Sequence, residues 1–293
     1  MRNDPILAVI GGSGLYEMDA LQNTEEVEIE TPYGKPSSSI IRGTLDGKEI
    51  AFLARHGIGH VYSPTQVNYR ANIYALKSIG VKKIVSISAC GSLRDDFKPG
   101  DIVIPDQLID FTKKRQNSFF EEGLVVHVGT AEPYCSDLHG TVCKAIQSTI
   151  EKTSSPACIH DSGSFITIEG PRFSTRAESN LFRTWGVSII GMTACPEAFL
   201  AREAEICYTT IAHVTDYDVW HITEEPVSVD MVIKTLMKNT QLAKESIRSV
   251  LSMMDAEQSC ECKDALADAV LTNKKAIQKA AAQKASIIID KYL

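Results

Sequence analysis

Residues 83–92 of the 293-residue chain read KIVSISACGS. The β-branched residues of the first half predict a strand over 83–88, which runs into Ala-Cys-Gly-Ser at 89–92. Before it, residues 66–79 carry apolar side chains at helical spacing and end at Gly80, as a helix commonly does. A helix leading into a strand of this kind is typical of an α/β domain.

The same pattern continues outward in both directions. Apolar runs at 6–10, 49–54, 186–192 and 207–214 predict further strands, and residues 197–205 and 227–254 have the spacing of helices. From 255 to 293 the composition changes to an Ala- and Lys-rich segment with few large apolar residues. We therefore expect one α/β domain over 1–254 and a helical C-terminal tail over 255–293, packed on the body or on a neighbouring subunit.

Composition and charge limit the partners. The chain is 44% hydrophobic and 23% charged, which is ordinary for a soluble globular protein. Its net charge is −7, so the protein has no overall positive potential of the kind that binding to nucleic acid or anionic membranes usually needs. No stretch approaches the ~20 apolar residues of a membrane span, and the N-terminus lacks the apolar region of a signal peptide. We expect a cytoplasmic protein with no nucleic-acid or membrane partner.

The cysteines do not have the spacing of a metal site. None of the eight forms a C-x-x-C pair, and the only close pair is Cys260-Glu261-Cys262. In a cytosol we expect reduced, inert thiols and no bound metal.

Polar residues follow several of the predicted strands, and they are candidate ligand contacts. They are Ser13 within Gly11-Gly12-Ser13-Gly14, Arg55 with His56, Ser88, Met192 with Thr193, and Asp216 with Asp218. In open α/β sheets, ligands bind outside the carboxyl ends of the strands, so residues far apart in sequence can converge there.

The first of these groups suit an anion. Glycines after a strand let backbone N–H groups approach phosphate, and Ser13 adds a hydroxyl. Arg55 offers a planar fork that matches phosphate oxygens. Ser88 and Thr193 supply hydroxyls, and Ala89 supplies a backbone N–H. The alternatives are a tight turn at Ser13, a surface ion pair for Arg55 and strand-end caps for the hydroxyls.

Asp216 and Asp218 suit acid catalysis. At i, i+2 beyond a strand, both carboxylates lie on one side if the chain stays extended. Two nearby carboxyls repel when both are ionised, so one tends to keep its proton and can act as a general acid. The alternative is an Asp-rich turn.

At these residues the sequence resembles the methylthioadenosine phosphorylase branch of the purine nucleoside phosphorylase family. The resemblance spans roughly residues 6–254. The matching motifs are IGGSGL at 10–15, TPYGKP at 31–36, ARHG at 54–57, NYRANI at 68–73, ACGSL at 89–93, IEGPRFS at 168–174, GMT at 191–193 and TDYD at 215–218.

The resemblance implies a twisted mixed β-sheet flanked by helices, assembled as a homotrimer or as a homohexamer built from two trimers. It implies a phosphate pocket made of Ser13, Arg55, His56, Ser88, the Ala89 backbone and Thr193. It places Phe173 beside the purine and Met192 under the ribose, and it brings His127 from an adjacent subunit toward the 5′ substituent. We also expect Ser174 and Val229 to influence substrate specificity.

The implied reaction cleaves 5′-methylthioadenosine with inorganic phosphate, in purine and methionine salvage. Phosphate is a co-substrate, and we expect no cofactor. We assign Asp216 to protonation of purine N7 and Asp218 to the 6-amino group, although the sequence leaves open which does which. Two carboxylates favour a 6-amino over a 6-oxo purine, because an amino group needs an acceptor.

Other functions remain open at this point. The same chemistry on adenosine, inosine, guanosine or methylthioinosine is the nearest alternative. A nucleoside hydrolase that uses water, and a nucleoside-binding protein without turnover, are others.

Two features depart from the family pattern as seen in animals. His213 stands where an apolar residue is expected, and it either tunes base selectivity or packs in the core. The tail's Cys-x-Cys pair resembles archaeal members, which raises the prospect of disulfides. Whether Cys260 pairs with Cys262, or Cys135 with Cys207, is left open.

Overall fold

The computed structural model describes residues 3–12, 15, 18, 20–221, 229–255 and 260–293, without the side chains of 229–240. Within this part of the chain, eleven strands form one mixed sheet. The strands are β1 (Leu7–Gly11), β2 (Leu21–Val27), β3 (Ile40–Leu45), β4 (Lys48–Ala54), β5 (Lys83–Ser92), β6 (Ile102–Val103), β7 (Gln107–Phe111), β8 (Ile159–His160), β9 (Ser164–Ile168), β10 (Ile189–Gly191) and β11 (Cys207–Asp216). The longer helices are α1 (Tyr69–Ser78), α2 (Ser136–Thr153), α3 (Arg176–Thr184), α4 (Ala194–Glu203) and α5 (Val229–Met253).

Four parallel strands form the middle of the sheet. β1 pairs with β4 on one side and with β5 on the other, and β5 pairs in turn with β11. The carboxyl ends of these strands therefore lie at one edge of the sheet. β10 runs antiparallel to β5, with Ile190 opposite Gly91, and it continues the sheet toward β9 and β7.

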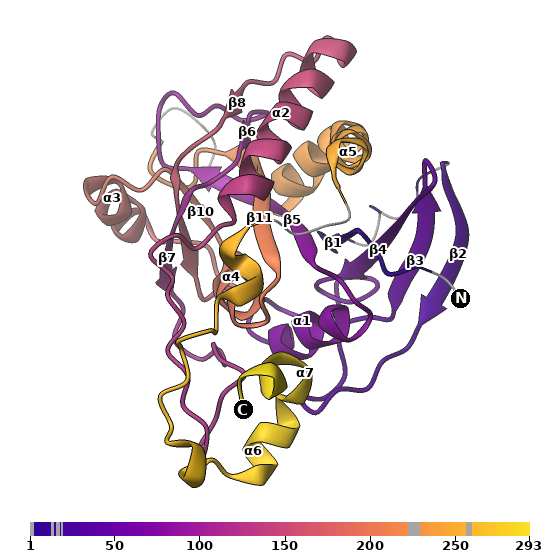
Figure 1. Cartoon of the computed structure of the whole chain (residues 1–293). Coiled ribbons are helices and arrows are strands. Elements are labelled where there is room, and N and C mark those ends of the chain that lie inside the picture. Colours follow the sequence, from indigo (N-terminus) through magenta and orange to yellow (C-terminus); the bar gives the residue numbers. More distant parts are fainter. Residues whose placement is uncertain (1–2, 13–14, 16–17, 19, 222–228, 256–259) are drawn as a thin grey trace.

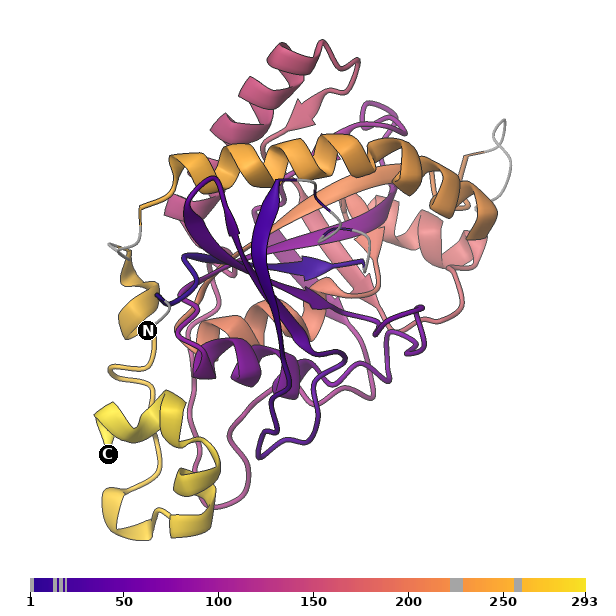
Figure 2. The same cartoon turned by 90° about the vertical axis from the view of Figure 1, so that its right-hand side faces the viewer.

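Helices cover both faces of the sheet, as Figures 1 and 2 show. Alternate residues of β1 face opposite sides: Leu7 and Val9 pack with α2 and α5, whereas Ala8 and Ile10 pack with α1 and α4. In Figure 2, α5 crosses one face of the sheet and α1 lies on the other. The twisted mixed sheet flanked by helices confirms the expected fold class.

The elements predicted from sequence are present with shifted ends. The helix expected over 66–79 is α1, and the strand expected over 83–88 extends to Ser92. The strand expected over 186–192 is only three residues long as β10. β2 escaped prediction because its residues 21–27, LQNTEEV, are largely polar and exposed. None of the described helices is long and apolar enough to span a membrane.

The tail is less helical than predicted. It consists of the 3₁₀ turns η2 (Glu261–Asp264), η3 (Lys274–Ala276) and η4 (Asp290–Tyr292) and the short helices α6 (Lys279–Lys284) and α7 (Ser286–Ile289). It packs on the body of the same chain (Figure 1). The buried Glu205 carboxylate anchors it, accepting hydrogen bonds from the Leu266 N–H and the Tyr292 hydroxyl and pairing with Lys291 at 2.7 Å.

Candidate active site

The ends of β1 and β4 lie together. The Arg55 N–H, just after β4, donates to the Gly11 carbonyl at 3.0 Å, and the Leu15 N–H donates to the Gly12 carbonyl at 3.2 Å. Ser13, expected to bind phosphate, lies outside the described residues. Gly11, which opens the glycine motif, therefore lies beside Arg55.

Arg55 is buried and bonded within the protein. Its Nε and Nη2 donate to the two Glu197 carboxylate oxygens at 2.7 and 3.0 Å. Nη2 also donates to the Ser86 hydroxyl, and Nη1 donates to the Ile87 carbonyl at 3.1 Å. Among the described residues, these bonds leave one N–H of Nη1 for a further acceptor. The ion pair considered for Arg55 exists, but it is a core pair rather than a surface one.

Ser88, in β5, and Thr193, the N-cap of α4 just after β10, come together. Their hydroxyl oxygens are 3.2 Å apart, and both side chains are buried. Thr193 arrives by a different route from the expected one. β10 is antiparallel to β5, so the chain that follows Gly191 continues toward the amino end of β5 and reaches the level of Ser88. Ala89 lies inside β5, opposite His213 of β11, and not beyond the strand end.

His56 is half-buried and held by its backbone neighbours. Its Nδ1 lies 2.9 Å from the Tyr62 carbonyl, and its ring stacks on that of His60 at 4.2 Å. Burial, followed by the Arg55 charge, lowers the pKa of His56 to about 4. The neutral ring donates from Nδ1 to that carbonyl, which leaves Nε2 as an acceptor.

Asp216 and Asp218 form a buried carboxyl pair at the end of β11. Asp216 Oδ2 accepts from the Thr215 hydroxyl at 2.7 Å, and Oδ1 accepts from the Asp218 N–H at 2.7 Å. Burial is the main cause that raises the pKa of Asp216 to about 6, and the Asp218 charge adds to it. Burial likewise raises the pKa of Asp218. No described residue hydrogen-bonds Asp218 Oδ2.

The other residues expected to contact the substrate differ in their burial and surroundings. Ser174 is buried, and its hydroxyl lies near the Asp218 carboxyl without a hydrogen-bond partner among the described residues, whereas Phe173, the preceding residue, is 36% exposed. Met192 lies against Gly170. A Cβ atom placed on Gly170 would lie 2.6 Å from the Met192 sulfur. The side chain of Val229 lies outside the part of the chain that the structure describes.

His127 is exposed on the loop between β7 and α2, and its N–H donates to the tail carbonyl of Ala269. Among the described residues of this chain, no hydrogen bond or ion pair joins His127 to Arg55, Ser88, Thr193 or the carboxyl pair.

Sequence reasoning missed two buried groups that hold the site in place. Glu197 on α4 pairs with Arg55 and also accepts from the Tyr208 hydroxyl at 2.9 Å. Arg115, in an unpatterned loop, donates from Nη1 to the carbonyls of Met192 and Cys195 at 2.7 and 2.6 Å. An acidic residue in a helix and an arginine in a loop carry no spacing signal that would identify them.

His213 is buried in β11, and neither ring nitrogen has a hydrogen-bond partner among the described residues. Burial lowers its pKa to about 4, so the ring is uncharged at neutral pH. The burial of His213 inside the strand favours packing over a contact with substrate.

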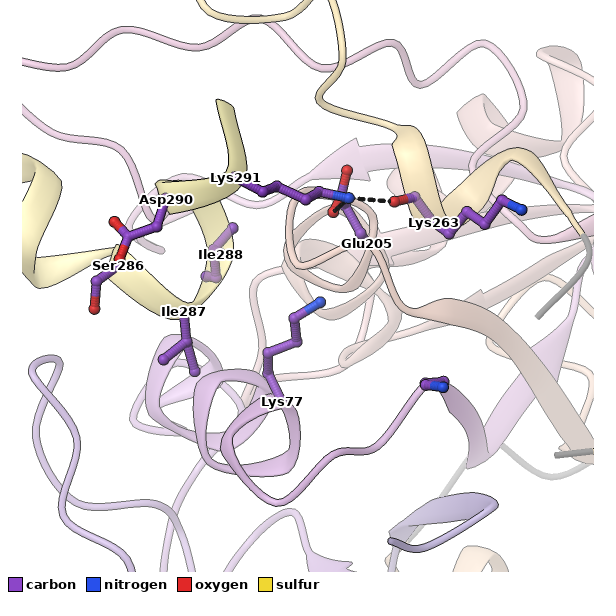
Figure 3. Close-up of a pocket in the computed structure, with 9 residues that line it drawn as sticks. Lys77, Glu205, Lys263, Ser286, Ile287, Ile288, Asp290 and Lys291 are labelled. Carbon is purple, nitrogen blue, oxygen red and sulfur yellow. Dashed lines mark hydrogen bonds and ion pairs between the residues drawn. The ribbon is translucent and has the colours of Figure 1, made fainter. Parts of the chain in front are cut away.

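A cavity of about 350 Å³ lies at the other end of the sheet (Figure 3). Lys82, just before β5, and Glu205, just before β11, line it together with tail residues such as Lys291. These positions are at the amino ends of the central strands. The cavity is therefore separate from the cluster that contains Asp216.

We expect Glu197→Gln to lower the free energy of unfolding by about 3 kcal/mol, because it leaves the Arg55 charge buried and uncompensated. Denaturant unfolding measures this. Asp46→Asn, which breaks the exposed pair with Arg248, is the control and should change little. If Arg55 contacts phosphate, added phosphate restores more stability to Glu197→Gln than to the wild type. An unchanged unfolding midpoint would show that the pair makes no net contribution.

Comparison with known proteins gives a consistent result. A family model described as the phosphorylase superfamily matches residues 6–252. A curated S-methyl-5′-thioadenosine phosphorylase from Geobacter sulfurreducens is 49% identical over 291 residues, covering 99% of this chain and 100% of that protein. One from Hyperthermus butylicus is 49% identical over 269 residues, covering 90% of this chain and 95% of that protein.

Solved structures agree with the sequence relatives. A methylthioadenosine phosphorylase sourced from an antarctic soil metagenomic library superposes with a TM-score of 0.92 at 46% identity, covering 98% of this chain and 100% of that one. The methylthioadenosine phosphorylase of Schistosoma mansoni in complex with adenine gives a TM-score of 0.84 at 35% identity, covering 90% and 98%.

Proposed function

The chain belongs to the phosphorylase superfamily, and from this premise we infer that it is an enzyme that cleaves 5′-methylthioadenosine with inorganic phosphate. The products are adenine and 5-methylthioribose 1-phosphate. The enzyme is a transferase of purine salvage that acts on a small-molecule nucleoside and on phosphate.

The observation that carries the site assignment is the distance along β5 between the two hydroxyls and the carboxyl pair. The hydroxyls of Ser88 and Thr193 meet at one level of this strand, and Gly91, paired with Asp216, lies three residues further on. Three residues of strand span ~10 Å. A purine nucleoside bridges such a distance, with its base at the carboxyls and its sugar facing phosphate at the hydroxyls.

The proposed chemistry has two charges to stabilise. Breaking the N-glycosidic bond builds positive charge on the sugar and negative charge on the departing purine. The protonated Asp216 gives its proton to N7, and Asp218 Oδ2 accepts from the 6-amino group. Phosphate stabilises the sugar cation and then attacks C1′, so that its oxygen replaces the purine nitrogen on that carbon.

The phosphate pocket in this proposal keeps the residues expected from sequence. Ser88 and Thr193 donate hydroxyls, and the spare N–H of Arg55 and the Ala89 backbone add donors. His56 Nε2 accepts from a protonated phosphate oxygen. Ser13 completes the pocket from the glycine turn. The reaction then needs phosphate as co-substrate and no cofactor.

We also propose that the enzyme is a homotrimer or a homohexamer in the cytoplasm. The apolar side chains of Ile58 and Val61, two and five residues after His56, are 59% and 65% exposed, which supports a subunit contact near the site. In such an assembly His127 of a neighbouring subunit reaches the 5′ substituent. The cytoplasm would keep the eight thiols reduced.

The deciding experiment measures adenine release from 5′-methylthioadenosine with and without phosphate, beside hypoxanthine release from inosine. We expect phosphate-dependent adenine release well above the inosine rate. Faster inosine cleavage would move the enzyme to 6-oxopurines. Base release without phosphate would indicate a hydrolase, and binding without release would indicate a nucleoside-binding protein.

Gly91→Ala should lower kcat/KM about tenfold, since small displacements of catalytic groups are costly. Its new Cβ would meet Asp216 Oδ1 at 3.0 Å and Asp218 Cβ at 3.2 Å. Steady-state kinetics measures the effect. Gly140→Ala, where nothing lies within 4 Å of the added carbon, is the matched control and should keep the wild-type rate. A wild-type rate in Gly91→Ala would mean that the carboxyl pair tolerates displacement.

A further inference from the structure

Four cysteines meet at the end of the sheet opposite the carboxyl pair. The Sγ atoms of Cys135, Cys207, Cys260 and Cys262 all lie within 4.8 Å of one another. Cys135 is the N-cap of α2, Cys207 is the first residue of β11, and the other two lie at the start of η2 in the tail. Spacing along the chain does not predict this cluster, because Cys135 and Cys260 are 125 residues apart. The spacing argument, which found no metal-ligand pattern along the chain, therefore missed a group of side chains that could hold a metal ion.

The sulfur positions are near those of a tetrahedral metal site. Zinc binds thiolates at ~2.3 Å, so the four sulfurs of a tetrahedral site lie ~3.8 Å apart. Here Cys207 and Cys260 Sγ are 3.1 Å apart, and Cys135 and Cys260 Sγ are 3.6 Å apart. We propose that these four cysteines bind one structural zinc ion that fastens the tail to the body.

The surroundings suit a closed, negatively charged site. Cys135, Cys207 and Cys262 are each no more than 4% exposed. Four thiolates around Zn²⁺ carry two net negative charges, and two neighbours offset them. Arg202 Nη1 donates to Cys262 Sγ at 3.2 Å, and the Leu138 N–H at the start of α2 donates to Cys135 Sγ at 3.5 Å. Hydrogen bonds to ligand atoms of this kind orient and stabilise a metal site.

A zinc site explains the arrangement better than two disulfides do. A disulfide needs two sulfurs at ~2.05 Å and sets no requirement on the other pair. Mutual proximity of all four sulfurs, contributed by a helix, a strand and the tail, is what tetrahedral coordination demands.

The role of this zinc is structural rather than catalytic. Cys207 and Asp216 are the first and last residues of β11, so the two sites lie ~30 Å apart. All four positions are taken by protein, which leaves no open position for a substrate. The ion would join Cys135 and Cys207 of the body to the segment that continues to Leu266 and the Glu205 anchor.

The first test is the metal content of the untagged, full-length chain, purified without a metal-affinity step and dialysed. Elemental analysis by mass spectrometry should find about one zinc per chain. Denaturation with a chelator, followed by alkylation without reductant, should modify all eight cysteines. Two disulfides, a protein without metal, or iron in place of zinc would each overturn the proposal.

Variants separate coordination from packing. Cys260→Ser should lose zinc and lower the melting temperature, whereas Cys260→His, which supplies a ligand nitrogen, should retain zinc. Cys158→Ser, at an exposed thiol outside the cluster, is the control and should keep both. Should Cys260→Ser fail to fold, Co²⁺ replacement in the wild-type protein gives a second readout, the intense absorption of tetrahedral thiolate cobalt. Wild-type zinc content in Cys260→Ser, or no thiolate absorption with Co²⁺, would overturn the proposal.

Discussion

Asp216→Asn is expected to lower kcat/KM for 5′-methylthioadenosine by about 10³-fold while the protein stays folded. The amide keeps the shape of the carboxyl and can still bond to the Thr215 hydroxyl and the Asp218 N–H, but it has no acidic proton to give to N7. Steady-state kinetics measures the loss, and the thermal midpoint checks the fold. A variant with a near-normal rate would remove Asp216 from the role of general acid.

The pH dependence gives this prediction a second readout. Burial raises the pKa of Asp216 to about 6, and the protonated form is the donor. With phosphate saturating, kcat/KM of the wild type should therefore fall as the pH rises above about 6. The Asp216→Asn variant should lack this decline. If both proteins show the same decline, another group is responsible for it.

Asp218→Asn is expected to change the preferred base. The Oδ2 atom of Asp218 is a buried acceptor without a described partner, which suits the hydrogens of a 6-amino group. An asparagine amide can donate to a 6-oxo group instead. We expect the ratio of kcat/KM for 5′-methylthioadenosine to that for 5′-methylthioinosine to fall by about 10³-fold, because sites built on hydrogen bonds discriminate strongly.

The two nucleosides have the same sugar, so any change in their ratio comes from the base. Ser174→Ala is a useful comparison, since it removes a neighbouring hydroxyl but leaves the carboxylate in place. It should lower both rates without reversing the preference. An Asp218→Asn variant that keeps the wild-type ratio would show that Asp218 does not contact position 6.

Much of the site could be predicted because polar residues follow apolar strands in the sequence. Arg55 after β4 and Asp216 at the end of β11 were found in this way, and the parallel pairing of β1, β4, β5 and β11 brings their ends to one edge. Thr193 was predicted as a residue that follows a strand, but that argument did not include the direction of the strand. It meets Ser88 because β10 is antiparallel to β5. The direction of a strand of only three residues cannot be predicted from its sequence.

What could not be predicted depends on contacts between residues distant in sequence. Glu197 is 142 residues from Arg55, and nothing in its helix distinguishes it from a surface glutamate. The four cysteines likewise meet only once α2, β11 and the tail are placed. Ser13 and the side chain of Val229 lie outside the described residues, and the role proposed for His127 requires a neighbouring subunit.

The alternation of β1 residues between the two faces of the sheet has a consequence for how the protein denatures. Leu7 and Val9 belong to the core beneath α2 and α5, and Ala8 and Ile10 to the core beneath α1 and α4. Neither layer of helices can detach without exposing residues of a strand that the opposite layer also needs. The two cores should therefore open together in a single cooperative transition, rather than as separately melting halves.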